Sequence, residues 1–261
     1  MDFLFDASET LTYCVTLLLL VLAAELGFRL GRRESRGIGE HTRSQAGAIQ
    51  AAVLGLLALL LGFTFSLSSA RFDARKQLVV QEANAIGTAA LRAALLPQPY
   101  PRELAKLFPP YVQVRLGFLD AGTDQDQLKE VARRTQALQT QMWALATAAA
   151  IADPHAVSTG LALQALNDMF DVTSKRSAAL RNRVPESVLQ LLFFVAFVSF
   201  ALTGYSLGLS GARALKLVLM LAALVAAVII LIVDLDRPRR GLIVVSQQSM
   251  LDLQQSLGAP D

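Results

Sequence analysis

The chain has 261 residues, 54% of them hydrophobic, and a formal net charge of only +3. Typical soluble domains contain ~45–50% apolar residues, so this composition, with a mean hydropathy of +0.46, predicts a membrane protein. The isoelectric point near 9.2 does not indicate nucleic-acid binding, because the arginines cluster beside apolar stretches, where lipid headgroups and membrane topology account for them. The single cysteine, Cys14, excludes an internal disulfide bond and a CxxC metal or redox site.

The first apolar stretch covers residues 11–30 and follows an acidic start, MDFLFDASET. A secretory signal needs a basic start, so we expect a retained transmembrane helix rather than a cleaved segment. Glu25 lies inside this span, four residues before Arg29 on the same helix face. Two interpretations stay open for Glu25: an ion pair that snorkels to the headgroups, or an intramembrane acid that lines a water-filled path.

A short basic loop after the first span gives the main signal for membrane orientation. The positive-inside rule places this loop in the cytoplasm and the N-terminus outside. Basic residues also flank the other spans on the opposite side, so the side of the membrane that the polar region faces stays undetermined. The loop residues are Arg32, Arg33, Arg36 and Arg43, and the opposing ones are Arg71, Arg75, Lys76, Arg181, Arg183, Arg237, Arg239 and Arg240.

The second apolar stretch, residues 46–70, organises the rest of the chain. It has no ionisable side chain and is long enough to cross a hydrocarbon core of ~30 Å. The chain then continues into a charged pattern with no proline before Pro97, and Phe72, Val79, Ala83 and Ile86 share one helical face. This pattern predicts a single helix of roughly 50 residues, ~75 Å long, half in lipid and half in water.

One face of the second span is a candidate pore lining. Leu59, Phe63 and Leu67 recur at four-residue spacing, and Ser66 lies among them in the stretch LLLGFTFSLSS. If several copies surround an axis, this face would form an apolar constriction that gates by dewetting. The alternative is that these aromatic and hydroxyl side chains make ordinary helix–helix contacts within the chain.

The region between the second and third spans is predicted to be an all-helical domain of roughly 115 residues, a normal size for one core. The segment PQPYP at residues 97–101 ends the long helix, and a helix over residues 102–119 follows, which Pro109-Pro110 disturb. The last helix of this region, within residues 158–184, carries apolar residues spaced alternately by three and four, which is typical of coiled-coil packing.

The third and fourth spans, residues 187–207 and 217–233, form a hairpin because the turn between them is too short for a domain. The amphipathic tail either lies on the membrane or docks under the helical domain, and docking is favoured because Asp252 is the only ionisable residue in its last stretch. The predicted fold is an all-α polytopic membrane protein with four transmembrane helices and a helical extramembrane domain inserted between the second and third. Its segments are residues 1–70, 71–186, 187–236 and 237–261.

Polar residues level with one another above the membrane form a second candidate site. If the long helix leaves the bilayer near residue 70 and the return helix enters near residue 185, antiparallel pairing brings two sets of side chains together. The sets are Glu82 and Asn84 on the outgoing helix and Asp168, Asp171 and Lys175 on the return helix. Two interpretations stay open: a structural network of ion pairs and amide bonds, and an oxygen-rich cation site or charged vestibule ring.

Motifs of soluble enzymes are missing from the sequence. There are two histidines, no HExxH and no glycine-rich phosphate loop. We therefore predict a protein that is not an enzyme, and the sequence indicates no cofactor. Because no calcium-loop spacing accompanies the juxtamembrane acids, no metal is assigned.

Three blocks of the sequence resemble the bacterial bestrophin-like membrane-protein family of unassigned function: RFDARKQLVVQEANAIGTA, LNDMFDVTSKRSAALRNRVP and DLDRPRRGLIVVSQQSM. The resemblance implies a bacterial inner-membrane protein with the layout of bestrophin anion channels. Bestrophins are pentamers with apolar neck side chains on their second membrane helix, and Leu59, Phe63 and Leu67 are the nearest match here. The sequence departs from them in lacking a dense acidic cluster like the bestrophin calcium clasp.

Two functions follow from these features. The first is a homo-oligomeric ion channel of four or five copies, with inorganic ions as its cargo and the second span lining the pore. The second is a non-conducting membrane scaffold or envelope-sensing module that presents its helical bundle to a partner, with an apolar patch around Trp143 as the contact. Both place the chain in the lipid bilayer and neither involves nucleic acid.

Overall fold

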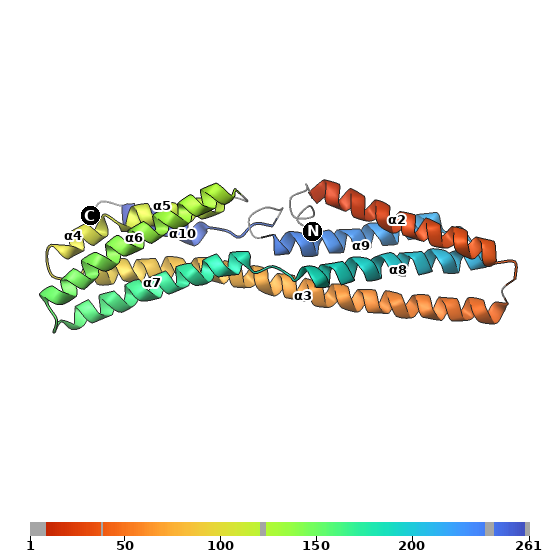
Figure 1. Ribbon diagram of the computed structural model, residues 1–261, viewed down its shortest axis with the longest axis horizontal. Coiled ribbons are helices and arrows are strands. Elements are labelled where there is room, and N and C mark those ends of the chain that lie inside the picture. The colour runs from red at the N-terminus through yellow and green to blue at the C-terminus, as the bar shows by residue number, and fades with distance from the viewer. Residues whose placement is uncertain (1–8, 38, 121–123, 238–242, 259–261) are drawn as a thin grey trace. The chain divides into compact units, whose positions relative to one another are not determined.

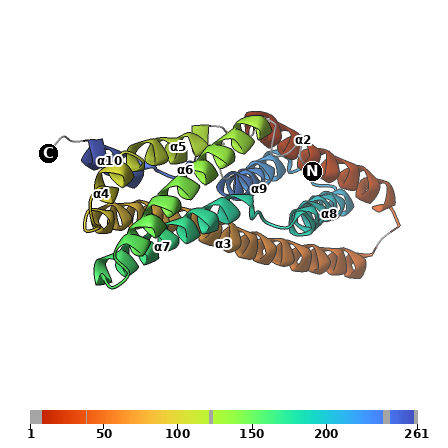
Figure 2. The same cartoon turned by 60° about the vertical axis from the view of Figure 1, so that its left-hand side comes forward.

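The structure of the protein is a computed structural model, which describes residues 9–37, 39–120, 124–237 and 243–258. All regular elements in these ranges are helices (Figures 1 and 2). The acidic first eight residues, together with Arg239 and Arg240, lie outside the described residues. The helices are α2 (Glu9–Glu34), α3 (Glu40–Ala93), α4 (Tyr100–Ala105), α5 (Phe108–Asp120), α6 (Gln125–Ala152), α7 (Val157–Arg181), α8 (Glu186–Ser210), α9 (Leu215–Asp236) and α10 (Gln248–Gly258).

Helix α3 is continuous over 54 residues, as the uninterrupted pattern before Pro97 predicts. Four helices are long and apolar enough to cross a membrane, and they include α2, α3, α8 and α9. The prediction of an all-α membrane protein with four transmembrane helices is therefore confirmed. The chain divides into two compact units, to both of which α3 contributes: a membrane unit, Met1–Arg71 with Arg183–Arg237, and a helical unit, Phe72–Asn182 with Pro238–Asp261.

Four glycines bring α2 and α8 into close contact in the membrane unit. A Cβ atom added to Gly204 would lie 1.8 Å from the carbonyl oxygen of Ala24, and one added to Gly27 would lie 1.9 Å from that of Ala201. Gly31 and Gly208 are equally confined, so each helix carries a GxxxG pair that lets the two backbones touch. Inside a bilayer the hydrophobic effect does not drive helices together, because the lipid is already apolar. Close van der Waals packing of this kind holds them together instead.

The segment after α3 begins with a short helix and a second, longer one. We predicted one disturbed helix over residues 102–119, but the structure has α4 and α5, and Pro109 and Pro110 stand near the start of α5. A proline is well tolerated in the first turn, because the backbone N–H that it lacks would have no partner inside the helix. The Pro-Pro pair therefore marks the beginning of α5 rather than a break within a longer helix.

The helical unit has its own core, in which small side chains let the helices approach closely. Ala89 on α3, Ala146 on α6 and Ala165 on α7 are buried together with Tyr111 of α5. The C-terminal helix α10 packs into the same core through Met250, which is fully buried, with Leu253 and Leu257 beside it. The tail is thus part of the helical unit.

Candidate functional site

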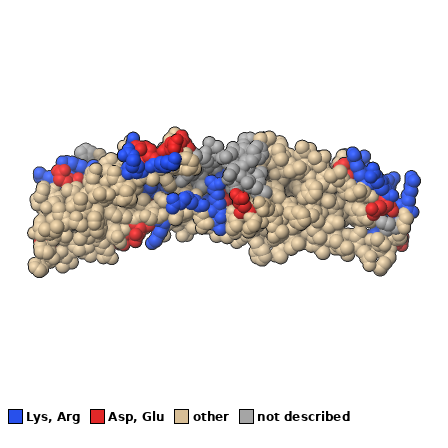
Figure 3. Space-filling view, in the orientation of Figure 1, with Lys and Arg blue, Asp and Glu red and all other residues tan. Residues whose placement is uncertain are grey.

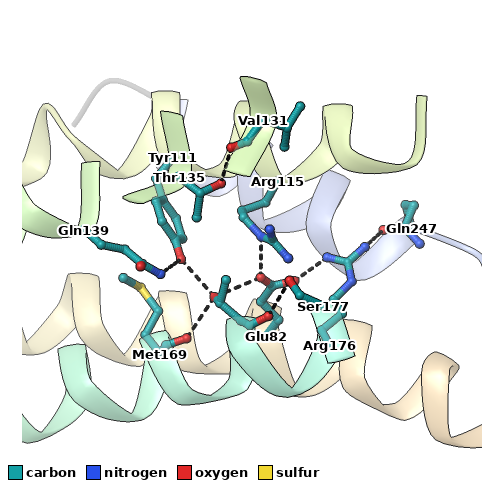
Figure 4. A network of polar contacts seen from close by, with 11 residues as sticks. Glu82, Tyr111, Arg115, Val131, Thr135, Gln139, Met169, Arg176, Ser177 and Gln247 are labelled. Carbon is teal, nitrogen blue, oxygen red and sulfur yellow. Dashed lines mark hydrogen bonds and ion pairs between the residues drawn. The ribbon is translucent and has the colours of Figure 1, made fainter. Parts of the chain in front are cut away.

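A buried charge network occupies the centre of the helical unit (Figure 4). Glu82 on α3 is inaccessible to solvent, and each of its carboxylate oxygens meets a guanidinium group that is itself buried. Arg115 of α5 donates from Nε to Glu82 Oε1 over 2.6 Å. Arg176 of α7 forms an ion pair with Oε2 through Nη1. One carboxylate thereby ties three helices together.

Neutral side chains extend this network to the remaining helices. Thr173 Oγ1 lies 3.0 Å from Glu82 Oε1, and the Tyr111 hydroxyl lies 2.8 Å from Thr173 Oγ1. The side-chain amide of Gln139 on α6 donates to Tyr111 over 3.0 Å. On the other side, Arg176 Nη2 donates to Gln247 Oε1 over 2.6 Å, immediately before α10. Every long helix of this unit and the C-terminal segment therefore contribute a hydrogen bond.

The charges of the network decide its protonation state. Burial alone would raise the pKa of Glu82, but the adjacent guanidinium groups of Arg115 and Arg176 outweigh burial and hold the pKa below its ordinary value. Burial raises the pKa of Tyr111, so its hydroxyl stays protonated and can donate. Glu82 is thus a carboxylate that accepts from two arginines, which makes the network a rigid structural centre.

The network differs from the predicted one in four of its five members. Glu82 is buried as described, but Asn84, Asp168, Asp171 and Lys175 are exposed, and none of them has a hydrogen bond or ion pair within the described residues. Helical phase is the reason. On α7 the residues facing the core are Met169, Thr173 and Arg176, and the predicted three lie on the opposite face.

Sequence reasoning missed Arg115 and Arg176. The signal for Arg115 was its place as the one basic residue of the apolar helix FPPYVQVRLGFLD, four residues after Tyr111 and therefore on the same face. The signal for Arg176 was its position on the helix. It follows Thr173 by three residues, so it lies on the same face of α7 as the apolar seam. An arginine within an apolar stripe needs a buried anion, and Glu82 is the matching acid in the apolar face of α3.

The candidate pore lining lies on a face of α3 that the chain itself leaves uncovered. Leu59, Phe63 and Leu67 are 54%, 66% and 38% exposed. Ser66 is exposed as well. Thr64, between these residues, is buried and donates back to the carbonyl of Leu60 over 2.7 Å. The four candidates therefore belong to one accessible surface, whose partner is lipid, water or another copy.

Glu25 is held by two arginines at one end of the membrane unit. Its Oε1 accepts from Arg29 Nε over 3.0 Å on the same helix, and its Oε2 accepts from Arg213 Nη2 over 3.2 Å, in the turn between α8 and α9. Glu25 keeps 26% of its side chain accessible, and both arginines are mostly exposed. The described residues contain no group of three or more His, Cys, Asp or Glu that could hold a metal ion.

The fold and these sites define a polytopic α-helical membrane protein whose second span extends into a helical unit with a charged centre. A family model for the Bestrophin-like domain matches residues 15–250. The chain belongs to this family, which confirms the resemblance seen in its sequence. No curated protein sequence matches the chain.

Solved structures similar to this one include bacterial bestrophin homologues from Klebsiella pneumoniae. One single-substitution variant aligns with a TM-score of 0.69 and 14% identity, covering 97% of each chain. Another aligns with a TM-score of 0.68 and 15% identity, covering 93% of this chain and 96% of the other. A structure phased with zinc aligns with a TM-score of 0.65 and 16% identity, covering 96% of this chain and 97% of the other. At such identities the comparison establishes the fold.

Proposed function

We propose that the protein is a homo-oligomeric ion channel of four or five copies in the bacterial inner membrane, with the uncovered face of α3 lining the pore. The observation that carries this proposal is the exposure of Leu59, Phe63 and Leu67 on one helix face, interleaved with Ser66. Bulky apolar rings at one-turn spacing form constrictions that water leaves readily, and hydroxyl groups next to them give a passing ion transient partners. The family and fold support the same function.

The packing of α3 leaves this face available to other copies of the chain. In the membrane part of α3 only Leu57, Thr64 and Ser68 are buried. The other helices of the chain therefore cover only a narrow stripe of this helix. Gly55 and Gly62 on this part of α3 have no atom within 4 Å of an added Cβ, so nothing within the chain requires their small size. Closed rotational symmetry would bring these uncovered faces together around one axis.

The test is ion flux through full-length protein in liposomes, with chloride and sodium gradients measured separately. Phe63→Ala widens the proposed constriction and should raise conductance. Phe194→Ala is the matched control, because Phe194 on α8 is 64% exposed, almost as much as Phe63, yet lies outside the proposed pore. Equal flux of wild type and Phe63→Ala in a confirmed ring would remove Phe63 from the pore. Absence of flux from folded, inserted protein would contradict the channel.

The second candidate function is a non-conducting scaffold that presents the helical unit to a partner, and a groove between α6 and α7 favours it. Trp143 and Phe170 pack with ring centroids 6.3 Å apart in this groove, and Gln136, Gln139 and Asn167 supply amide groups. Trp143 is 39% exposed, so the groove presents an aromatic surface that a partner could cover. Crosslinking in membranes distinguishes the two functions, because a scaffold predicts monomers or dimers and a channel predicts closed rings.

A further inference from the structure

An apolar groove opens on the membrane unit between α2, the end of α8 and the start of α9. It is a shallow groove on the surface of the membrane unit, open along one side, and not an enclosed cavity. Val21, Phe28, Leu207, Leu215 and Val218 line its apolar part. A groove of this kind in a membrane-spanning region is filled by hydrocarbon or by another protein, because its apolar walls offer water no hydrogen-bond partners.

Charged side chains lie at the mouth of this apolar groove. Glu25 and Arg213 belong to its lining, and Arg29 shares the Glu25 carboxylate. The guanidinium carbon of Arg213 also lies 5.5 Å above the ring of Phe28, which holds this side chain over the groove. Glu25 uses one nitrogen of each arginine, and the other nitrogens of these two groups remain able to donate.

Further positive charge gathers at the same end of the membrane unit (Figure 3). Gly211 caps α8 with a φ of +73°, and an added Cβ there would lie 2.6 Å from Arg32 Nη1, so Arg32 lies against the turn that also contains Arg213. The basic side chains at this end outnumber the acidic ones, and one acid, Glu34, is bound to the Tyr205 hydroxyl over 2.6 Å. The basic residues include Arg29, Arg32, Arg33, Arg36, Arg43, Arg213 and Lys216, and the acids include Glu25, Glu34 and Glu40.

From this arrangement we propose that the groove binds one anionic phospholipid per chain. The acyl chain occupies the apolar part, and the phosphate accepts hydrogen bonds from Arg29 and Arg213, which Glu25 holds in position. Forked guanidinium groups match phosphate oxygens in geometry and charge, and basic pockets between membrane helices select anionic headgroups. This inference is independent of the channel proposal.

Two other occupants fit the groove less well. A second copy of the chain would bring its own excess of arginines to the same mouth, where like charges repel. A free phosphate ion would satisfy the arginines but would leave the apolar walls without contact, because an ion carries no hydrocarbon. A lipid satisfies both parts of the site at once.

Native mass spectrometry of the full-length protein tests the proposal, with phosphatidylglycerol and phosphatidylcholine of identical chains titrated separately. Wild type should retain one phosphatidylglycerol per chain in preference to phosphatidylcholine. Arg213→Gln should weaken phosphatidylglycerol binding roughly tenfold, the effect of one charge-assisted hydrogen bond. Arg134→Gln is the matched control, because Arg134 pairs with Glu130 four residues away on α6, as Arg29 pairs with Glu25. It should leave lipid binding unchanged.

Leu215→Trp provides a second variant that leaves every charge in place. Leu215 is half exposed at the start of α9, so a larger side chain would fill the groove without entering the core. It should also weaken phosphatidylglycerol binding. Equal retention of the two lipids, the same binding by Arg213→Gln and Arg134→Gln, displacement of the lipid by an equal concentration of inorganic phosphate, or replacement of lipid by a second copy would each overturn the proposal.

Discussion

Helix α3 is packed in opposite ways along its two parts. In the membrane unit it buries Leu57, Thr64 and Ser68, whereas several of its other large apolar residues, such as Phe63, are exposed. In the helical unit the same helix buries a complete face, which consists of Arg75, Val79, Glu82, Ala83, Ile86, Ala89 and Ala93. One continuous helix is therefore a peripheral element in one unit and a core element in the other.

The difference follows from the two solvents. In water the apolar face of α3 gains free energy only when other helices of the chain cover it, so the helical unit surrounds it. In lipid an uncovered apolar face costs nothing, so the chain can leave it for other copies or for hydrocarbon. The charged residues differ between the units as well. In the helical unit Glu82 is buried with its two arginines, whereas in the membrane unit Glu25 and its two arginines keep access to solvent.

Glu82→Gln should have the largest effect, because it leaves two buried guanidinium groups without their anion. Breaking a buried ion pair by removing one partner costs about 3–5 kcal/mol. Hydrogen exchange of the purified protein should show faster exchange in α5 and α7 while α8 and α9 keep their protection. Uniform loosening of both units would show that the two do not respond separately.

The control for this variant is Glu130→Gln on α6. Glu130 forms ion pairs with Arg133 and Arg134 over 2.7 Å and 2.6 Å, and these arginines hold its pKa at about 2. Its side chain is nevertheless accessible, so water screens and replaces the lost contacts. Glu130→Gln should leave the exchange pattern and the unfolding temperature unchanged.

Gly204→Ala should act on the other unit with a smaller effect. The added methyl group would lie 1.8 Å from the Ala24 carbonyl, so α2 and α8 must separate, at a cost of about 1–3 kcal/mol. Exchange should accelerate in α2 and α8 and stay unchanged in α5 and α7. Gly117→Ala on α5 is the control, because no atom lies within 4 Å of its added Cβ, and alanine is the better helix former.

The sequence predicted those parts of the fold that depend on hydrophobic length and on helix-breaking residues. The four spans and the continuity of α3 follow from apolar runs and from the absence of proline before Pro97. The partners of Glu82 were not found, because residues were paired by their height above the membrane and not by the helix face on which they lie. On α7 the buried face carries Thr173 and Arg176, whereas the residues predicted to pair with Glu82 lie on the exposed face.

The close contact of α2 and α8 also escaped the sequence analysis, although its signal was present. Gly27 with Gly31 and Gly204 with Gly208 are both GxxxG pairs within apolar spans. Such pairs show that a helix has a close neighbour, and only the structure shows that each pair faces the other. The exposed face around Phe63 is a different case. The structure of one chain shows that this face is uncovered, and only the structure of an assembly shows what covers it.

Acid should produce the smallest effect, and the part of it that comes from Glu82 should act on the helical unit. The folded-state pKa of Glu82 is depressed below 4.5, its ordinary value, so the carboxylate stabilises the fold fully above that pH and loses this contribution as pH falls toward the folded-state value. Unfolding temperatures of wild type should therefore decline below about pH 4.5, and Glu82→Gln should show a flatter profile because it has no proton to gain there. Parallel profiles for the two proteins would mean that Glu82 does not change its protonation between the folded and unfolded states, which contradicts its ion pairs with Arg115 and Arg176.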